Sequence, residues 1–246
     1  MYKTIKFFVN KLIPRKIMFR HEPLLRKVYA THFRGKTHQC NVCDYNLSKF
    51  IILPNKDKLC PNCGSLSRDR RLWQLLKKEF LDENQKILDF SPSRCLSRKL
   101  KTIKTIDYKN TDLSGNFNAD YKYDITKLDL PNDTLDLIIC YHILEHIEDD
   151  QLAMNELFRV LKPTGKAIVQ TPYKEGEIYE NEKITTSAER LVHFGQEDHV
   201  RIYSEQGLKS RLESAGFEVQ IRHFRQLDTF LELSNETIFI LTKPTI

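Results

Sequence analysis

The clearest pattern of hydrophobic and polar positions lies in residues 135–172, where three segments follow one another. The first is the apolar run LDLIIC, which is continuous enough for a strand buried on both faces. Between residues 152 and 161, leucines and a valine recur with a period of about 3.6, and the sequence KPTG ends this helical pattern. A second apolar run, AIVQTP, follows. This order predicts a right-handed parallel crossover of strand, helix and strand in a sheet covered on both faces.

The chain around this centre has room for one α/β domain of ordinary size and a small appendage, because it has 246 residues. Hydrophobic residues make up 40% and charged residues 29%, and no apolar run approaches the roughly 20 residues of a membrane span. Four of the six cysteines form two close pairs, and we expect no secretory leader before them. We therefore expect metal ligation rather than disulfides, in a cytoplasmic protein.

The net charge of +6 is concentrated in the first 36 residues, which carry ten Lys and Arg against the single Glu22. This arm has a local charge of +9 and leaves −3 for the remainder. Its apolar side chains share one helical face, namely Ile5, Phe8, Val9, Leu12 and Ile13. We expect a basic amphipathic helix docked on its own domain, with peripheral contact to a membrane surface or to nucleic acid as the alternatives.

Two Cys-x-x-Cys knuckles, Cys40 with Cys43 and Cys60 with Cys63, are separated by 16 residues. Each knuckle presents two thiolates to one ion, and a short hairpin between them would complete a tetrahedral site of four sulfurs. Gly64 suits the tight turn after the second knuckle. The spacing predicts a zinc ribbon over residues 37–66 with a structural zinc ion, because four thiolates leave no open coordination position.

A helix is expected to follow the ribbon, because Ser65 is a suitable cap and apolar residues recur at helical spacing up to Phe80. Its first turn contains Arg68, Arg70 and Arg71. We expect these arginines to be solvated, with contact to a phosphate as the alternative.

The stretch DLIICYHILEHIEDDQLAMNELFRVLKPTGKAIVQTP resembles the fourth strand, helix and fifth strand of class I S-adenosylmethionine-dependent methyltransferases of the type 11-like group. The words LEHI and RVLKP are the specific part of the match, and Thr164 stands where the family usually has glycine. The resemblance implies an α/β fold with a Rossmann-like seven-stranded sheet, helices on both faces and a small N-terminal zinc ribbon. The expected domains are a basic arm over residues 1–36, the ribbon, and a methyltransferase domain over residues 67–246.

The first strand and turn of that domain correspond to KILDFSPSRCL, in which Ser91, Pro92 and Ser93 replace the family's G-x-G. Glycine is normally wanted there so that the backbone turns and approaches the cofactor closely. Either the chain is a catalytically dead relative, or it makes the same turn with proline and small hydroxyl residues. A similar turn occurs in zinc-ribbon methyltransferases of bacteria, which are often associated with surface-polysaccharide genes, and this favours an active enzyme.

The same resemblance implies how S-adenosylmethionine would be held. Asp112, rather than Asp107 within the strand, would accept hydrogen bonds from the ribose hydroxyls, and Asp124 with Ile125 would contact the adenine. The alternative for Asp124 is a turn residue. Tyr141 and His142 would face the transferred methyl, while His146 is expected to be structural. The full set of implied cofactor-binding residues is Asp89, Ser91, Ser93, Asp112, Leu113, Asp124, Ile125 and Tyr141.

A long polar insertion over residues 173–203 follows the fifth expected strand, where such domains place the acceptor. Its segment HFGQEDHVRIY resembles a word of the zinc-ribbon subgroup. We expect His199 or His193, with His142 as a further candidate, to take a proton from the acceptor, because histidine titrates near neutrality. Arg201 and Tyr203 are expected to bind the acceptor. The alternative is an unorganised polar loop.

Taken together, these patterns predict a methyltransferase that acts on a small-molecule or saccharide-type acceptor, at oxygen. One alternative is an RNA methyltransferase, since the basic arm suits phosphate binding. Another is a non-catalytic scaffold that kept the fold, since the glycines of the first loop are missing. The acceptor and the oligomeric state do not follow from the sequence.

Overall fold

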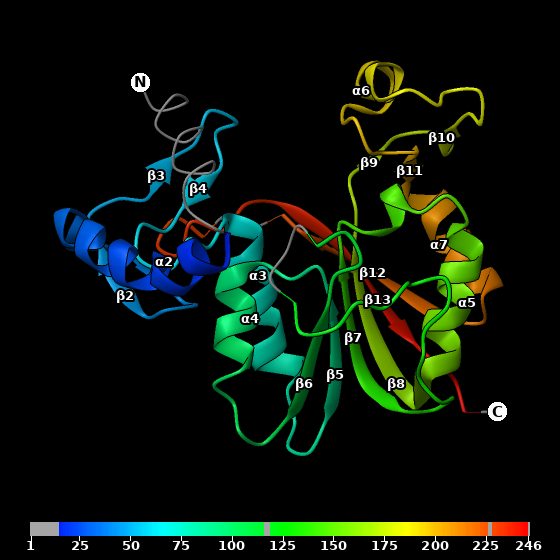
Figure 1. The fold of residues 1–246 in the computed structure, drawn as a ribbon, viewed down its shortest axis with the longest axis horizontal. Coiled ribbons are helices and arrows are strands. Elements are labelled where there is room, and N and C mark those ends of the chain that lie inside the picture. Colours follow the sequence, from blue (N-terminus) through cyan, green and yellow to red (C-terminus); the bar gives the residue numbers. More distant parts are fainter. Residues whose placement is uncertain (1–14, 116–118, 226–227, 246) are drawn as a thin grey trace. The chain divides into compact units, whose positions relative to one another are not determined.

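The structure is a computed structural model that describes residues 15–115, 119–225 and 228–245 (Figure 1). The amphipathic helix expected around Ile5 to Ile13 lies outside these residues. The chain forms two compact units, which are treated one at a time. The first contains residues up to Glu79, Ser93–Thr102 and Arg225–Asn235, and the second contains Phe80–Pro92, Ile103–Phe224 and the segment from Glu236 onward.

The first unit combines the ribbon with helices. Strands β1 and β2 pair antiparallel, as do β3 and β4, so each knuckle adjoins a short hairpin. Trp73 is buried at 6% exposure, but Arg70 and Arg71 are buried too, at 0% and 6%. The expectation of a solvated turn is therefore wrong for these two and right for Arg68, which is exposed. The elements are α2 (Arg15–Ala30), η1 (Thr31–Phe33), β1 (Arg34–Cys40), β2 (Tyr45–Leu47), β3 (Ile51–Ile52), β4 (Lys58–Leu59), α3 (Ser67–Leu75), η2 (Leu76–Phe80) and α4 (Arg94–Leu100).

The second unit is an α/β sheet domain with an insertion. Its elements are β5 (Lys86–Phe90), β6 (Asp107–Thr111), β7 (Leu135–Tyr141), η3 (Leu144–His146), α5 (Asp150–Val160), β8 (Leu161–Gln170), β9 (Tyr173–Lys174), β10 (Tyr179–Glu180), α6 (Ser187–Phe194), β11 (Arg201–Ser204), α7 (Glu205–Ser214), β12 (Glu218–Phe224) and β13 (Glu236–Thr242). Strand β7, helix α5 and strand β8 form the parallel crossover that the hydrophobic pattern predicts.

The sheet order is β12-β13-β8-β7-β5-β6, with β6, β5, β7 and β8 parallel and β13 and β12 antiparallel at one edge. Among the described residues the sheet thus has six strands instead of the expected seven. The position beside β6 is held by one parallel bridge, between Thr111 and Tyr121. The reason lies in the local sequence YKYD, which has no apolar run to bury and leaves Tyr121 exposed at 38%.

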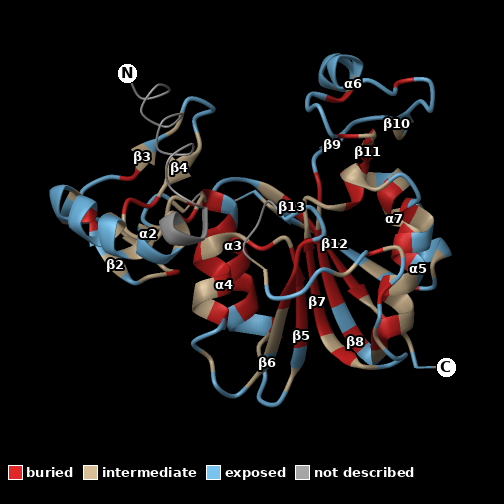
Figure 2. Ribbon diagram, in the orientation of Figure 1, coloured by how far each residue is buried: buried red, intermediate tan, exposed pale blue. Residues whose placement is uncertain are grey.

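The core of this unit lies between one face of the sheet and helices α5 and α7 (Figure 2). Leu157 and Val160 of α5 and Leu212 of α7 pack there at 0% exposure. Residues on the other sheet face, such as Ile87 and Ile168, are equally buried. The expected α/β fold class is confirmed by this architecture. The part of the chain that the structure describes contains no helix long and apolar enough to cross a membrane.

Two turns of this unit place an ordinary residue where glycine is usual. Thr164, in the irregular first part of β8, has φ +66°, while Gly165 beside it does not take the left-handed conformation. Gly165 is required for space instead, because a Cβ there would lie 2.7 Å from the Lys162 carbonyl oxygen. The second position is Ser91, at the end of β5.

Candidate active site

The second unit has a topological switch point between β5 and β7. From β5 the chain adds β6 on one side, and later β7 on the other. In open parallel sheets, ligands bind beyond the carboxyl ends of the strands at such a point. The residues that end these strands therefore define the candidate site.

The loop after β5 is held by Ser91, whose φ of +45° is in the left-handed region. Its amide donates to the Thr111 carbonyl oxygen at 2.7 Å, which ties the end of β5 to the end of β6. Serine thus adopts the backbone conformation that glycine takes more easily, at a cost of roughly 1–3 kcal/mol. Ser93 belongs to the first unit, where it precedes α4 and its hydroxyl lies 3.3 Å from Cys95 Sγ.

Asp112 follows β6 directly and is 4% exposed. Its Oδ1 accepts a hydrogen bond from the Ser91 hydroxyl at 2.8 Å, and Ser114 Oγ lies 3.1 Å from Oδ1 and 3.0 Å from Oδ2. The carboxylate therefore already meets two hydroxyl groups, which is the donor set that a vicinal diol presents. The neighbouring Leu113 is 57% exposed, so an apolar side chain stands beside this carboxylate on the surface.

The other expected cofactor residues have clear internal roles. Asp89, within β5, is 3% exposed and accepts from the Tyr108 hydroxyl at 2.8 Å. Asp124 is exposed, and its Oδ1 accepts from the Thr126 amide at 2.9 Å and hydroxyl at 2.7 Å, hydrogen bonds that lower the pKa of Asp124. This is a turn geometry, while the adjoining Ile125 is buried. Contact of Asp124 with adenine stays a prediction.

His142 is the first residue after β7 and has φ +55°. Its amide donates to the Gln170 carbonyl oxygen at 2.8 Å, and its Nδ1 lies 3.3 Å from Glu145 Oε1. Burial raises the pKa of Glu145, but His142 outweighs this effect and the pKa is lowered overall. Tyr141, the last residue of β7, is half-buried. Strained non-glycine residues thus end both strands of the switch point, as is common at functional sites.

A second group lies beside His142. Glu145 and His146 in η3 meet His199 from the insertion, and one ligand-type atom of each lies within 4.8 Å of the others. The two imidazole rings are edge to face, with centroids 4.6 Å apart. Burial and the neighbouring His146 lower the pKa of His199, so this ring is neutral near pH 7.

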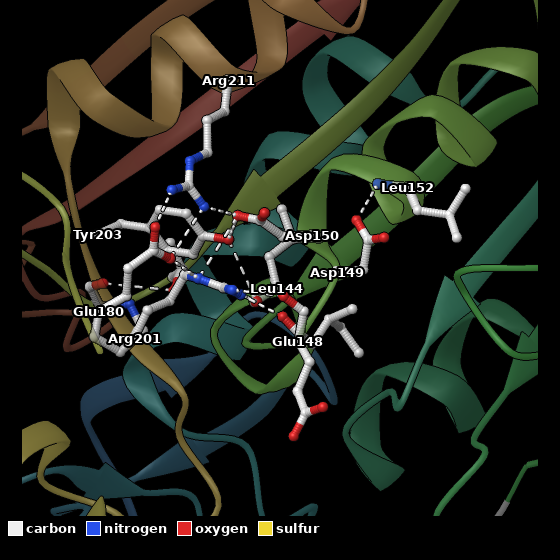
Figure 3. A network of polar contacts seen from close by, with 12 residues as sticks. Leu144, Glu148, Asp149, Asp150, Leu152, Glu180, Arg201, Tyr203 and Arg211 are labelled. Atoms are coloured by element: carbon white, nitrogen blue, oxygen red, sulfur yellow. Dashed lines mark hydrogen bonds and ion pairs between the residues drawn. The ribbon is translucent and has the colours of Figure 1, made fainter. Parts of the chain in front are cut away.

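Arg201 and Tyr203 of β11 also lie near η3, but both side chains are buried and bind other residues of the protein (Figure 3). Arg201 donates to Glu180 Oε2 at 2.8 Å, to the Glu148 carbonyl at 2.8 Å and to the carbonyls of Leu144 and Ile147. The Tyr203 hydroxyl donates to Asp150 Oδ2, and burial raises the pKa of Tyr203 well above its usual value. Arg211 of α7 joins Asp150 and Glu180. These side chains therefore hold the insertion against the loop after β7.

His193 is not part of this cluster. It is exposed on α6, and its Nδ1 lies 2.7 Å from the Tyr179 hydroxyl. The structure thus brings His142, His146 and His199 around Glu145, and leaves His193 at the surface of the insertion.

The sequence analysis did not identify the network that joins Asp150, Glu180 and Arg211. It also treated His146 only as a structural residue. The LEHI word was a signal for a carboxylate beside a histidine, but their third partner, His199, lies 53 positions after His146. No short motif links residues that far apart.

The four ribbon cysteines of the first unit lie together. Cys40 Sγ is 3.6 Å from Cys63 Sγ, and Cys43 Sγ is 3.8 Å from Cys60 Sγ. A tetrahedral zinc ion with Zn–S bonds of about 2.3 Å would place its sulfurs about 3.8 Å apart. The geometry is therefore compatible with one tetrahedral ion.

The two knuckles have the same backbone form. The Asp44 amide donates to the Cys40 carbonyl at 2.7 Å, and the Gly64 amide donates to the Cys60 carbonyl at 2.9 Å. Asp44 and Gly64 both have positive φ, at +58° and +82°. The turn expected of Gly64 is thus present, and the first knuckle makes it with an aspartate.

Residues 66–220 match the family model for a methyltransferase domain. Over 96 residues the chain is 32% identical to a Mycolicibacterium smegmatis protein named as an S-adenosylmethionine-dependent methyltransferase, a match that covers 39% of this chain and 34% of that protein. The chain thus spans about a third of the length of this curated relative.

Solved structures share the fold at low identity. The cyclase SpnF has a TM-score of 0.55 and 14% identity, over 94% of this chain and 96% of that chain. A Bacillus halodurans protein described as a methyltransferase has a TM-score of 0.51 and 16% identity, over 71% of this chain and 99% of that chain. Likeness at this level shows the fold alone.

Proposed function

Because this chain belongs to the methyltransferase domain family, we propose that it transfers a methyl group from S-adenosylmethionine to a small-molecule or saccharide-type acceptor, at oxygen. The observation that carries the proposal is the pairing of Ser91 with Asp112 at the switch point. Ser91 gives the loop its left-handed turn without glycine, and the Asp112 carboxylate is set to accept from two hydroxyls. A ribose diol at this edge would replace the hydroxyls of Ser91 and Ser114.

When bound, S-adenosylmethionine supplies an electrophilic methyl on a sulfonium sulfur. The chain's own contribution is to hold the two reactants at near-attack distance and to accept the proton of the acceptor hydroxyl. Of the three expected histidines, we favour His142 for this proton, because it directly follows β7 and is oriented by Glu145 Oε1. Arg201 and Tyr203 then act as positioning residues, since their polar atoms already bind the loop.

We further infer that the ribbon cysteines hold a structural zinc ion, which is supported by the tetrahedral spacing of the four sulfurs. RNA as acceptor and a role without catalysis stay the alternatives, and the likeness to a cyclase is a reason to test the reaction directly.

Calorimetry with S-adenosylmethionine tests the cofactor site. Wild-type protein should bind, and Asp112→Ala should lose roughly 10-fold or more in affinity, because hydrogen bonds to a charged group are removed. Asp107→Ala is the matched control, since Asp107 is exposed at the start of β6, the strand that Asp112 follows, and its replacement should not change cofactor affinity. A protein without measurable binding at millimolar cofactor would be a scaffold rather than an enzyme.

Transfer of a labelled methyl group to fractionated small metabolites, sugar nucleotides and total RNA tests the acceptor class. Label in the first two fractions supports the proposal, and label confined to RNA replaces it with the RNA alternative. His142→Ala should lower turnover by roughly 10²-fold or more, with cofactor affinity nearly unchanged. His193→Ala serves as the control because that ring lies at the surface.

A further inference from the structure

Glu145, His146 and His199 have the chemistry and spacing of metal ligands. One ligand-type atom from each lies within 4.8 Å of the other two, so a single ion could contact all three. All three residues belong to the sheet unit, and none is part of the cysteine cluster. Two of them, Glu145 and His199, are buried at 1% and 4% exposure.

The Glu145 carboxylate provides an independent sign of a missing partner. Oε1 lies 3.3 Å from His142 Nδ1, but the buried Oε2 has no hydrogen-bond partner among the described residues. The Thr171 hydroxyl lies 3.4 Å from the Pro172 carbonyl oxygen, and its contact with the Glu145 carboxylate helps to lower the pKa of Glu145. A buried carboxylate oxygen without a partner is costly, so native proteins pair it or coordinate it to a cation.

The imidazoles are held in a way that suits coordination. His146 Nδ1 lies 3.2 Å from the Asp198 carbonyl oxygen, so it carries the proton and leaves a lone pair on Nε2. The Val200 amide donates to the Glu145 carbonyl at 2.9 Å, which fixes the segment with His199 against η3. The buried Arg201 then anchors the same segment to the carbonyls of Ile147 and Glu148. The backbone around the three side chains is therefore fixed from both sides.

We propose that Glu145, His146 and His199 bind one divalent first-row transition-metal ion, separate from the ribbon site. Two imidazoles and one carboxylate suit Mn²⁺, Fe²⁺ or Co²⁺, and three protein ligands leave positions for oxygen ligands. Binding of this ion goes beyond the proposed function and does not depend on it. If the methyl transfer is as proposed, an acceptor hydroxyl on the ion would lose its proton to His142 more easily, because a bound cation lowers the pKa of the hydroxyl.

Mn²⁺ titration followed by electron paramagnetic resonance tests the site without cofactor or acceptor. The protein is purified with its ribbon zinc in place, since Mn²⁺ prefers oxygen and nitrogen ligands and competes poorly for four thiolates. One Mn²⁺ should bind per chain. His146→Ala and His199→Ala should each weaken binding by roughly 10-fold or more, because a direct ligand is lost. His193→Ala is the control, a histidine of the same insertion outside the cluster, and should bind as the wild type does.

Pulsed resonance on the wild-type protein keeps the test independent of whether the variants fold. Coupling of the bound ion to two imidazole nitrogens is the expected result. Failure of the wild type to bind Mn²⁺ or Co²⁺ saturably up to about 1 mM would overturn the proposal. Binding that both variants leave unchanged, or a signal without imidazole coupling, would overturn it equally. A protein that binds the ion but transfers no methyl group would contradict the proposed function alone.

Discussion

Two small regions of this protein each depend on a buried arginine, and they balance its charge differently. Arg70 lies in the ribbon unit at 0% exposure, and Arg201 lies in the insertion of the sheet unit at 5%. Among the described residues, the buried apolar side chains are few in both regions: Val42, Leu47 and Phe50 beside the cysteines of the ribbon, and Ile184, Phe194 and Tyr203 in the insertion. Each is held by polar contacts that an arginine organises.

Arg70 donates to backbone carbonyls. Its guanidinium reaches the carbonyl oxygens of Ser65 at 2.8 Å, Leu231 at 2.7 Å, Glu232 at 2.9 Å and Lys58 at 3.1 Å. Burial lowers the pKa of Arg70, and the nearby cysteine thiolates are the main groups that oppose this effect. Four thiolates with one zinc ion carry a net charge of −2, so the proposed metal site is the natural counter-charge for Arg70.

Arg201 is balanced by carboxylates instead. Glu180 Oε2 lies 2.8 Å from its Nε, and Asp150 Oδ2 lies 3.7 Å away. Arg211 completes a network of two arginines and two carboxylates. The stability that Arg70 contributes should therefore depend on the ribbon metal, whereas the stability that Arg201 contributes should depend on pH.

Removal of the ribbon metal should have the largest effect. Structural zinc sites in small domains contribute about 10–16 kcal/mol of binding free energy, which is also folding free energy. Chelation, or Cys60→Ser, should therefore loosen residues 36–66 while the sheet unit, which has its own apolar core, stays folded. Metal analysis combined with hydrogen exchange measures both. Cys140→Ser is the control, because Cys140 lies in the sheet unit and outside the four-cysteine group. Purified protein without stoichiometric zinc would contradict the proposed site.

Arg70→Ala should be the next most damaging change, by about 3–5 kcal/mol in the free energy of unfolding, because it removes the cation beside the thiolates and unpairs buried carbonyls. Proteolysis within residues 36–66 and 228–235 should become faster. Arg68→Ala is the matched control, since Arg68 is exposed on the same helix. If Arg70→Ala and Arg68→Ala are equally stable, Arg70 does not hold the ribbon together.

How far the sequence predicts these features depends on the distance between partners along the chain. The crossover around β7 and the cysteine site are visible because their periods and spacings are local. Burial of Arg70 is not visible, because Leu231 and Glu232 lie more than 160 positions away. The conformation of Ser91 depends likewise on Thr111 and Asp112, at the end of another strand. For Arg201, the sequence predicted acceptor binding. Its actual partners, in residues 144–150, lie more than 50 positions before it and cannot be inferred from the motif around Arg201.

Replacement of Arg201 distinguishes the two roles of this residue. If it holds the insertion, Arg201→Ala should cost about 2–3 kcal/mol, less than Arg70→Ala because Glu180 stays partly solvated. Arg201→Lys should also be destabilising, since lysine lacks the planar fork that reaches several carbonyls. Both changes should lower kcat with KM nearly unchanged. Arg190→Ala is the control, because Arg190 belongs to the same insertion and its guanidinium pairs with the exposed Glu148. A raised KM at unchanged stability would restore Arg201 to acceptor binding.

The pH dependence of the stability that Glu180 contributes is the smallest of these effects, and it tests the carboxylate network directly. Burial raises the pKa of Glu180, but Arg211 and Arg201 outweigh it and the pKa is lowered overall. A folded-state pKa below the unfolded value means that the carboxylate stabilises the fold fully above the unfolded pKa of about 4.3. That stabilisation is lost as the pH falls through the folded pKa. Since the side chain is 39% exposed and screened by solvent, we expect at most about 1 kcal/mol.

Urea unfolding of wild type and Glu180→Gln between about pH 7 and pH 3 measures this contribution. The free energies of unfolding of the two proteins should differ by at most about 1 kcal/mol near neutrality and should converge in acid. Glu182→Gln, an exposed neighbour in the same insertion, should track the wild type at every pH. A separation that persists unchanged into acid would mean that the arginines do not lower the pKa of Glu180. Asp150, which pairs with Arg211, would then be the carboxylate that balances the arginines of the insertion.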